Sequence, residues 1–405
     1  MAKIKPFKAL RFNETLKEDI SKNICPVYDI INESEYNKYI NKSPHNTIRL
    51  EKPVGYDCYN KAKNTLNLWI SQNILSYENK DSIYIYEQEF IFDNQVKKIH
   101  GIICLVKIED FEKQIIIPHE TTLNAPKNDR LNLLKSTKSM FSPIFSLYDD
   151  KNNITENRLT PFMKKKPKLE FKDDNNIIHR LWIIKEKSEI TKICNDFTNR
   201  KLYIADGHHR YETAQKFKTI SGNKYTMMYL SNIINENIII LPTHRLIKNN
   251  FEFNLCNFFN ECTKYFNITQ LKNEIELQKQ LNIIHNENQH GFGLYNKKKY
   301  YILILKSSIQ FKSTCSGYDV SIFNDFIIEK ILNKNINIQN DIDFTRDITF
   351  AIQSVDENKH SIAFFLNPTT LSQIINAANS QEKMPQKSTY FFTKVIAGLT
   401  MYKMD

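Results

Sequence analysis

Short runs of β-branched and aromatic residues alternate along this 405-residue chain with segments whose apolar residues recur three and four positions apart. Runs of the first kind are typical of strands, and segments of the second kind are typical of amphipathic helices. Their interleaving predicts an α/β fold of the mixed α+β kind. The expected strands are 82–92, 99–108, 114–118, 180–185, 201–205, 225–231 and 237–241, and the expected helices are 60–75, 207–219, 321–333 and 369–378.

The length of the chain favours two domains, because single hydrophobic cores stop growing at roughly 250 to 300 residues. Residues 149–176 are polar, rich in Lys and Asn, and contain Pro161 and Pro167. Such a composition is typical of a linker or a long loop. We therefore expect an N-terminal α/β region at 1–148 and a second α/β region at 177–405, which together can pack as one unit.

The formal net charge of +11 raises the question of a nucleic-acid partner. Only nine of the 56 basic residues are Arg, and Lys is spread along the chain together with Ile and Asn. The run Lys164-Lys165-Lys166-Pro167-Lys168 is the one concentration, and a solvated linker is its simpler interpretation. A nucleic-acid partner is therefore not expected.

The sequence contains no apolar run near the roughly 18 residues of a membrane span, and lysines interrupt residues 1–10 where a secretory signal would be apolar. The seven cysteines are scattered and include no Cys-x-x-Cys pair. We therefore expect a cytoplasmic protein that contacts no membrane, has reduced thiols, and carries no zinc, haem or iron–sulfur cluster.

The run Lys201-Leu202-Tyr203-Ile204-Ala205 continues directly into Asp206-Gly207-His208-His209-Arg210, and a helical segment follows. A strand, a tight turn and a helix in this order set polar side chains at the edge of a sheet, beside the open N–H groups of the helix. Such a place suits phosphate or carboxylate. Gly207 permits close approach of a ligand, and Arg210 offers a fork for phosphate oxygens.

The polar residues of this turn have two interpretations. In the simpler one, Asp206 caps the following helix and the histidines lie on the surface. In the other, Asp206 holds Mg²⁺ or accepts a proton, and His208 and His209 act as acid, base or phosphate acceptor near neutral pH. Five such residues in succession have little use in packing, so we favour a functional site.

The sequence resembles the domain-of-unknown-function 1015 family at several separate places. The family's Ile-Ala-Asp-Gly-His-His-Arg is intact at residues 204–210. The other matching segments are Ile4-Lys5-Pro6-Phe7-Lys8-Ala9-Leu10-Arg11, Tyr28-Asp29-Ile30, His119-Glu120-Thr121-Thr122, Met384-Pro385-Gln386-Lys387-Ser388-Thr389-Tyr390-Phe391 and Lys394. These segments run nearly from end to end, which makes the match far more specific than a lone short motif.

That family is in turn similar to the ParB/sulfiredoxin superfamily, in which a Gly-x-x-Arg turn at a helix start binds nucleotide phosphates. The turn maps onto Gly207 and Arg210 here. The resemblance implies a ParB/sulfiredoxin-like core with an additional C-terminal α+β region. Sulfiredoxin and a free-serine kinase use this scaffold for phosphoryl transfer, whereas ParB uses it for nucleotide-dependent DNA clamping.

Relatives in the family are commonly encoded beside enzymes that make phosphoserine. The resemblance therefore implies phosphoryl transfer with ATP or ADP and Mg²⁺, acting on serine, phosphoserine or a similar small hydroxy acid. The kinase and phosphatase directions both stay open, as does the oligomeric state.

Two further segments carry candidate site residues. His119 and Glu120 follow a short apolar strand, and a carboxylate next to an imidazole raises its basicity, which suits a general base. A hydrogen-bonded structural pair is the alternative. Candidates for phosphate binding that also fit structural roles are Lys387, Ser388, Thr389 and Arg245.

The chain departs from the family pattern after Glu120. Relatives carry a charged run there, and of this chain's residues 123–130 only Asp129 and Arg130 match it; the segment Thr345-Arg346 and Ala397 also differ. Three hypotheses result: a phosphoryl-transfer enzyme, a ParB-like nucleotide-dependent DNA-binding protein, and a degenerate relative kept for binding. The first is preferred, because no clear helix-turn-helix with a recognition helix is present.

Overall fold

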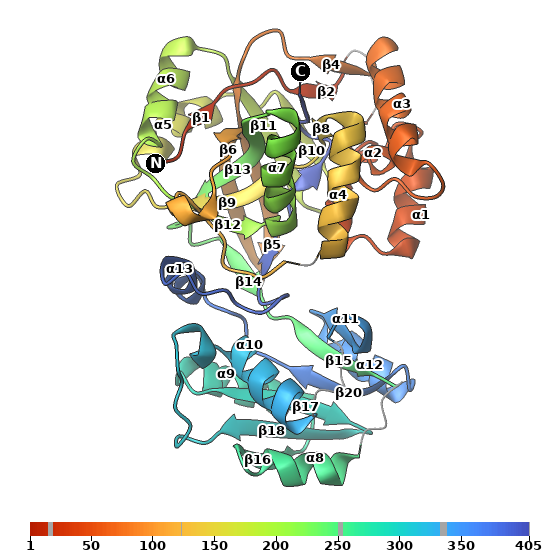
Figure 1. Ribbon diagram of the computed structural model, residues 1–405, viewed down its shortest axis with the longest axis vertical. Coiled ribbons are helices and arrows are strands. Elements are labelled where there is room, and N and C mark those ends of the chain that lie inside the picture. The colour runs from red at the N-terminus through yellow and green to blue at the C-terminus, as the bar shows by residue number, and fades with distance from the viewer. Residues whose placement is uncertain (15–18, 123, 250–253, 333–337, 405) are drawn as a thin grey trace. The chain divides into compact units, whose positions relative to one another are not determined.

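The computed structural model describes residues 1–14, 19–122, 124–249, 254–332 and 338–404 (Figure 1). The chain divides into two compact units. Unit 1 comprises Met1–Pro118, Thr122–Ile239 and Thr393–Asp405, and unit 2 comprises His119–Thr121 and Ile240–Phe392. Both units combine helices with strands, which confirms the expected mixed α/β class. The ParB/sulfiredoxin-like core stays a prediction.

Unit 1 is built on a nine-stranded sheet in the order β10-β11-β5-β6-β13-β9-β12-β7, with β1 also paired to β6. The sheet is mixed, because β13–β9 and β12–β7 are parallel and the other pairs are antiparallel. All six apolar runs expected as strands in this region are strands, since β-branched and aromatic side chains suit a buried pleated surface. The bounds are β1 (Ile4–Lys5), β5 (Ile83–Phe92), β6 (Gln95–Lys107), β7 (Ile116–Ile117), β9 (Ile144–Tyr148), β10 (Leu169–Lys172), β11 (Ile178–Ile184), β12 (Leu202–Asp206) and β13 (Tyr225–Asn232).

Helices pack around this sheet, and the expected helices 60–75 and 207–219 are confirmed as α3 and α7 with slightly shifted ends. Helices α4 and α7 pack against each other and lie side by side in Figure 1. The helix bounds are α1 (Glu33–Lys42), α2 (Ile48–Glu51), α3 (Cys58–Ser71), α4 (Asn124–Thr137), α5 (Ile154–Met163), α6 (Lys187–Asp196) and α7 (His208–Ser221).

The end of the chain returns to unit 1 through small two-stranded sheets. Strand β22 (Ile396–Ala397) pairs with β3 (Cys25–Pro26), and β23 (Tyr402–Lys403) pairs with β8 (Ser139–Met140). A third small sheet joins β2 (Leu10–Phe12) to β4 (Leu75–Tyr77). This return brings Lys394 into the same unit as the Asp206–Arg210 turn.

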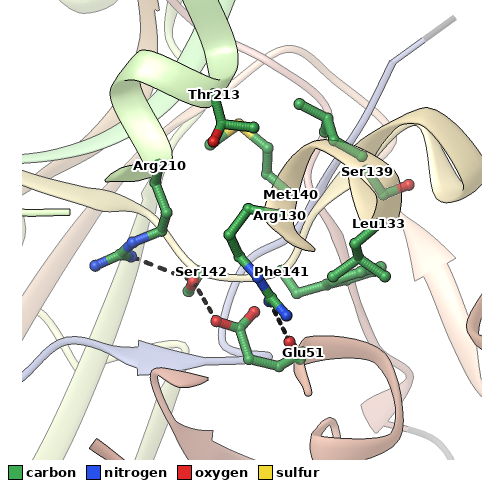
Figure 2. Close-up of a pocket in the computed structure, with 10 residues that line it drawn as sticks. Glu51, Arg130, Leu133, Ser139, Met140, Phe141, Ser142, Arg210 and Thr213 are labelled. Atoms are coloured by element: carbon green, nitrogen blue, oxygen red, sulfur yellow. Dashed lines mark hydrogen bonds between the residues drawn. The ribbon is translucent and has the colours of Figure 1, made fainter. Parts of the chain in front are cut away.

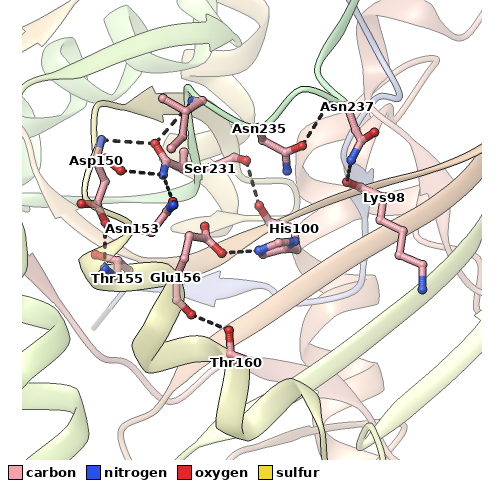
Figure 3. Close-up of polar contacts among 12 residues, drawn as sticks. Lys98, His100, Asp150, Asn153, Thr155, Glu156, Thr160, Ser231, Asn235 and Asn237 are labelled. Carbon is pink, nitrogen blue, oxygen red and sulfur yellow. Dashed lines mark hydrogen bonds and ion pairs between the residues drawn. The ribbon is translucent and has the colours of Figure 1, made fainter.

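The expectation that residues 149–176 form a linker is wrong. The segment contains α5 and β10, and β10 pairs with β11 in the large sheet. Figure 3 shows its polar side chains hydrogen-bonded inside unit 1: Asp150 Oδ2 accepts from Thr155 N at 2.7 Å, and Glu156 contacts His100 on β6. Polar composition wrongly predicts a linker here, because these polar side chains form hydrogen bonds with other residues of the fold instead of with water.

Unit 2 contains a six-stranded antiparallel sheet in the order β16-β18-β17-β20-β15-β19. Two neighbouring residues of β20 belong to two different apolar clusters. Phe364 packs with Phe292 and Phe323, whereas Phe365 packs with Leu277. Side chains alternate across a strand, so each face of the sheet has its own core. The bounds are β15 (His244–Lys248), β16 (Phe266–Leu271), β17 (Gly291–Asn296), β18 (Lys299–Leu305), β19 (Ile342–Thr345) and β20 (His360–Phe365).

The remaining elements of unit 2 include both helices expected there. The segment 321–333 forms α10 (Asp319–Ile322) and a π-helical stretch at Phe323–Ile331, and residue 333 lies outside the described residues. The segment 369–378 is α13 (Leu371–Asn379). The expected strand 237–241 is found as β14 (Ile239–Leu241), which pairs with β21 (Tyr390–Phe392). The other helices are α8 (Leu255–Cys262), α9 (Glu274–Asn286), α11 (Ile338–Asp341) and α12 (Ile348–Asp356).

The two units therefore divide differently from the expected regions 1–148 and 177–405. The main boundary falls at 239/240, and neither unit is continuous in sequence. Thr121 N donates to Met384 O, which draws the segment His119–Thr121 into unit 2. Pairing between segments far apart in sequence decides these boundaries, and local composition does not predict such pairing.

The His100–Glu156 contact predicts a pH-dependent stability. Burial alone would lower the pKa of His100, but the hydrogen bond and charge of Glu156 outweigh it, so the pKa is raised. A raised pKa means that the contact stabilises the fold fully below the unfolded value of about 6.5 and less as pH rises through the folded value. We expect His100→Gln to lower the free energy of unfolding by about 1.5 to 3 kcal/mol at pH 5.5, and by less at pH 8.5. Urea denaturation measures both values, and a cost that does not change with pH would contradict the assignment.

Candidate functional site

The turn between β12 and α7 has the geometry that the sequence predicts. Strand β12 is buried along its whole length, Gly207 adopts a φ of 94°, and α7 begins at His208. This φ lies in the left-handed region, which favours glycine. A side chain at residue 207 would also meet Arg210, because a Cβ there would lie 2.9 Å from Arg210 Nε. Gly207 thus permits the Arg210 side chain to fold back over the turn.

Both carboxylate oxygens of Asp206 accept from cationic side chains. Arg210 Nη2 lies 2.7 Å from Oδ2, and Lys394 Nζ donates to Oδ1. Burial alone would raise the pKa of Asp206, but the charges of Lys394 and Arg210 outweigh burial and hold the pKa well below its usual range. Asp206 therefore stays ionised and is a weak base. The interpretation of Asp206 as a helix cap is wrong, since Gly207 is the N-cap.

The Arg210 guanidinium is buried and holds two parts of unit 1 together. In addition to Asp206, it donates through Nη1 to Ser142 Oγ at 3.2 Å and to Pro143 O at 2.5 Å. Burial alone would lower the pKa of Arg210, but nearby carboxylates, Asp206 first, outweigh it and raise the pKa. Arg210 is thus a permanent cation whose fork fixes the loop before β9. Its contact with a phosphate stays a prediction.

Behind the turn lies a small cavity of about 40 Å³, lined by residues of α2, α4, α7 and the loop 141–142 (Figure 2). Ser142 Oγ donates to Glu51 Oε1 at 2.9 Å, and Arg130 Nη1 donates to the backbone carbonyl of Glu51. Burial raises the pKa of Glu51 despite the opposing charges of Arg130 and Arg210. A cavity of this size has room for about three waters, well below the roughly 300 to 1,000 Å³ of small-molecule sites, so it is a support for the turn and not a metabolite pocket.

Glu51 and Ser142 are residues of the candidate site that the sequence does not reveal. No local pattern marks either residue, because each matters only through contacts with residues 68 to 91 positions away. Arg130 was noted as a family match, and the structure gives it a contact: its guanidinium lies 4.1 Å from the centroid of the Tyr28 ring. Residues 124–130, in the segment that departs from the family pattern, lie at the start of α4, which begins at Asn124. Residue 123 lies outside the described residues.

The two histidines of the motif occupy the first positions of α7. His208 is buried, with 7% of its surface exposed, and His209 is half-buried. One turn further on, Glu212 Oε2 accepts from Thr122 Oγ1 at 2.8 Å and from Lys127 Nζ at 2.9 Å. These contacts tie the start of α4 to α7 and fix the first turn of the motif helix from a second side.

In unit 2, the structure brings together the two remaining family segments. His119 Nε2 lies 3.1 Å from Thr389 Oγ1, and Glu120 Oε1 accepts from Lys387 N at 3.1 Å. His119 is fully buried, whereas the Lys387 side chain is at least partly exposed. Residues some 270 positions apart thus form one polar cluster.

Arg245 and Ser388 support this cluster from inside. Arg245 Nη2 donates to Lys387 O at 3.3 Å, and Ser388 Oγ donates to Pro385 O at 2.5 Å. Burial lowers the pKa of Arg245 to about 9, although the charge of Glu120 acts in the opposite direction. Arg245 is therefore still a cation at neutral pH. Both side chains are occupied by backbone carbonyls of the 384–391 segment.

The turn does not fit a protein-bound Mg²⁺ ion. Both oxygens of Asp206 already accept from cations, and an added cation would be repelled by Arg210 and Lys394. Among the described residues, no group of three or more His, Cys, Asp or Glu side chains is placed to hold a metal. Asp206 is therefore not suited to the role of a Mg²⁺ ligand that the sequence suggests.

A family model described as "Protein of unknown function (DUF1015)" matches residues 4–327. The chain belongs to this family. The match confirms the resemblance over residues 4–327, which include the motif at 204–210, whereas the segment 384–391 and Lys394 lie outside the matched residues. No curated protein matches the chain. In the part of the chain that the structure describes, no helix is both long and apolar enough to cross a membrane.

Several solved structures are distantly similar to this member of the DUF1015 family. A free serine kinase in complex with AMP has 10% identity and a TM-score of 0.41, and the match covers 75% of this chain and 91% of that chain. A conserved hypothetical protein from Pyrococcus furiosus has 12% identity and a TM-score of 0.38, with 71% and 90% covered. SbnI with a C-terminal truncation, from Staphylococcus aureus, has 9% identity and a TM-score of 0.39, with 72% and 84% covered.

The buried position of Asp206 predicts a large cost for losing its charge. Asp206→Asn leaves Lys394 and Arg210 without their counter-charge, so we expect the free energy of unfolding to fall by about 3 to 5 kcal/mol at pH 7. A lowered pKa means that this stabilisation is present above the unfolded value of about 3.9 and is lost as pH falls through the folded value. Urea denaturation between pH 3 and 8 measures the difference.

Asp174 provides a matched control for Asp206. Its carboxylate also lies between two cations, Lys38 at 2.9 Å and Lys42 at 2.8 Å, but it is on the surface. Asp174→Asn should cost only about 0 to 1 kcal/mol. Equal costs for the two substitutions would contradict a buried, structure-determining Asp206.

Proposed function

We propose that this protein transfers a phosphoryl group between a nucleotide, ATP or ADP, and a small hydroxy acid of the serine type or its phosphate. The observation that carries the proposal is the turn from β12 into α7, where Gly207 opens a 14-residue helix beside two cationic side chains. Phosphoryl transfer depends mainly on positioning and on stabilising the charge of the phosphate oxygens. A turn of this kind offers both.

Three features of the turn favour a phosphate. The first-turn N–H groups of α7 lie at the positive end of the helix dipole. Gly207 has no side chain to cover them. Arg210 and Lys394 together carry two positive charges against the single negative charge of Asp206, so the turn keeps a net positive charge. A phosphate placed there gains attraction without requiring a new side-chain arrangement.

His208 is our candidate for the base. It occupies the first position of α7, and an imidazole titrates closer to neutral pH than any other unperturbed side chain. In the kinase direction, the substrate hydroxyl gives its proton to the base while its oxygen bonds to the γ-phosphorus. The bond to the β,γ-bridging oxygen breaks, and ADP leaves. Asp206 is excluded from this role by its lowered pKa and is assigned to positioning.

The cluster in unit 2 is proposed, taken by itself, as a candidate anion site. Of its phosphate-binding candidates, Lys387 is exposed, whereas Arg245 and Ser388 are buried against backbone carbonyls. We therefore assign the anion contact to Lys387 and the support of its loop to Arg245 and Ser388. His119 with Thr389 and Glu120 stays a second candidate pair for proton transfer.

Calorimetric titration with MgATP, ADP and phosphoserine tests the proposal, followed by ³¹P NMR of mixtures with serine and other small hydroxy acids. We expect binding of a nucleotide and the appearance of a new phosphomonoester, or of inorganic phosphate in the phosphatase direction. Absence of binding to all three compounds would overturn the proposal. Nucleotide binding without turnover would instead favour the non-catalytic relative, and a salt-sensitive gel shift with DNA would favour the ParB-like protein.

Two substitutions in the turn should give different phenotypes. Arg210→Lys keeps the charge but loses the fork that fixes the turn to Asp206 and Pro143 O, so we expect nucleotide binding to weaken by about 1.5 to 3 kcal/mol in a variant that circular dichroism shows to be folded. His208→Gln should leave binding nearly intact while kcat falls by roughly 10² to 10⁴. Titration and steady-state kinetics measure both.

Lys216→Gln is the control for these substitutions, because Lys216 lies on the same helix at a position that is not buried. It should change neither quantity by more than about 0.5 kcal/mol. If Arg210→Lys behaves like Lys216→Gln, the phosphate site is not at this turn.

A further inference from the structure

Residues 165–168 of the lysine run line an open pocket in unit 1. The sequence predicts a solvated linker there, but the segment turns from the end of α5 into β10 and borders a hollow of about 400 Å³ against β11. The pocket is lined by Phe162, Lys165, Lys166, Pro167, Lys168, Trp182, Ile183, Lys185 and Glu186. Its volume falls within the roughly 300 to 1,000 Å³ of small-molecule sites.

The backbone of this pocket is fixed by contacts with β11. Trp182 Nε1 donates to Lys165 O at 2.8 Å, and Lys168 N donates to Leu181 O at 2.8 Å. These bonds hold the turn in one place, so the side chains that project from it are presented by a defined backbone. This fixed backbone distinguishes the lysine run from a charged segment that moves freely in solvent.

The charge in the pocket is positive and only partly balanced. Lys168 pairs with Glu14 at 2.5 Å and Lys185 with Glu78 at 2.9 Å. Lys165 and Lys166 are exposed and have no carboxylate partner within 4.0 Å among the described residues. The one lining carboxylate, Glu186, accepts from the backbone N–H of Lys185 at 3.1 Å.

The other wall of the pocket is apolar, formed by Phe162, Trp182 and Ile183. The ammonium groups of Lys165 and Lys166, which have no carboxylate partner, lie with two paired lysines beside an aromatic and aliphatic wall, and this favours a ligand with several negative charges close together. Lysine binds phosphate as a point charge, and several phosphates in a row match several lysines. A flat ring attached to such a ligand would find a surface to pack against.

We propose that this pocket is a second ligand site of unit 1, which binds a phosphate-rich anion: an inorganic polyphosphate or the triphosphate of a nucleotide. The site shares no residue with the β12–α7 turn, so this proposal can be tested independently of the proposed function. Attraction is electrostatic and therefore weakens with salt.

Calorimetric titration of the full chain with sodium tripolyphosphate and, separately, with ATP tests the proposal. We expect the double substitution Lys165→Glu/Lys166→Glu to weaken tripolyphosphate binding on the order of tenfold or more at low salt, and by less as salt rises. The matched control is Lys61→Glu/Lys63→Glu, which makes the same charge change on exposed positions of α3, on the opposite side of unit 1 from α5 (Figure 1). Circular dichroism checks that both variants fold.

The source of the anion is read from the same titrations. Equal affinities for tripolyphosphate and ATP would assign the binding to the phosphates alone, and tighter binding of ATP than of tripolyphosphate would assign its ring to the apolar wall. To separate this site from the turn, the ATP titration is repeated in Arg210→Lys, which should weaken binding at the turn and leave binding at the pocket unchanged. The proposal is overturned if tripolyphosphate does not bind, or if the 165/166 and 61/63 variants lose affinity equally.

Discussion

The buried carboxylate of Asp206, held between the Arg210 guanidinium and the Lys394 ammonium, is the contact on which the candidate site depends. It joins three parts of the chain: the end of β12, the first turn of α7, and the C-terminal segment that returns to unit 1. A buried charge that loses a partner costs several kcal/mol, so each cation is required in its place. The same contact keeps Asp206 ionised and makes it an anchor, so in the proposed function proton transfer is assigned to an imidazole.

A chain of hydrogen bonds between buried polar side chains extends from this anchor. Arg210 contacts Ser142, Ser142 donates to Glu51, and Arg130 holds the backbone of Glu51 from the opposite side. Gly207 makes the arrangement possible, because a side chain there would collide with the folded-back Arg210. The position of the first turn of α7 is therefore determined from behind by buried polar groups, while its N–H groups lie at the start of the helix. Such fixed donors suit an anion, because no reorganisation is needed when it binds.

Much of the fold is predictable from the sequence, and so is the location of the turn. The run Leu202–Asp206 is buried and mostly apolar, a glycine follows, and a helical period begins, so strand, turn and helix are each encoded locally. The partners of the turn are not encoded locally. Glu51 and Ser142 reach it through packing of distant segments, and the polar stretch 149–176 becomes α5 and β10 because its side chains find partners such as His100. Local composition predicts elements, whereas long-range pairing decides which polar side chains meet.

Hydrogen–deuterium exchange with and without saturating MgATP tests the central claim most directly, because it reports on the backbone N–H groups themselves. If the anion binds at the start of α7, peptides that cover residues 204–212 should gain protection when MgATP is added. That gain should be lost in Arg210→Lys at the same nucleotide concentration and persist in Lys216→Gln. Binding of MgATP with no change in the 204–212 peptides, or with protection confined to residues 164–186, would contradict the account.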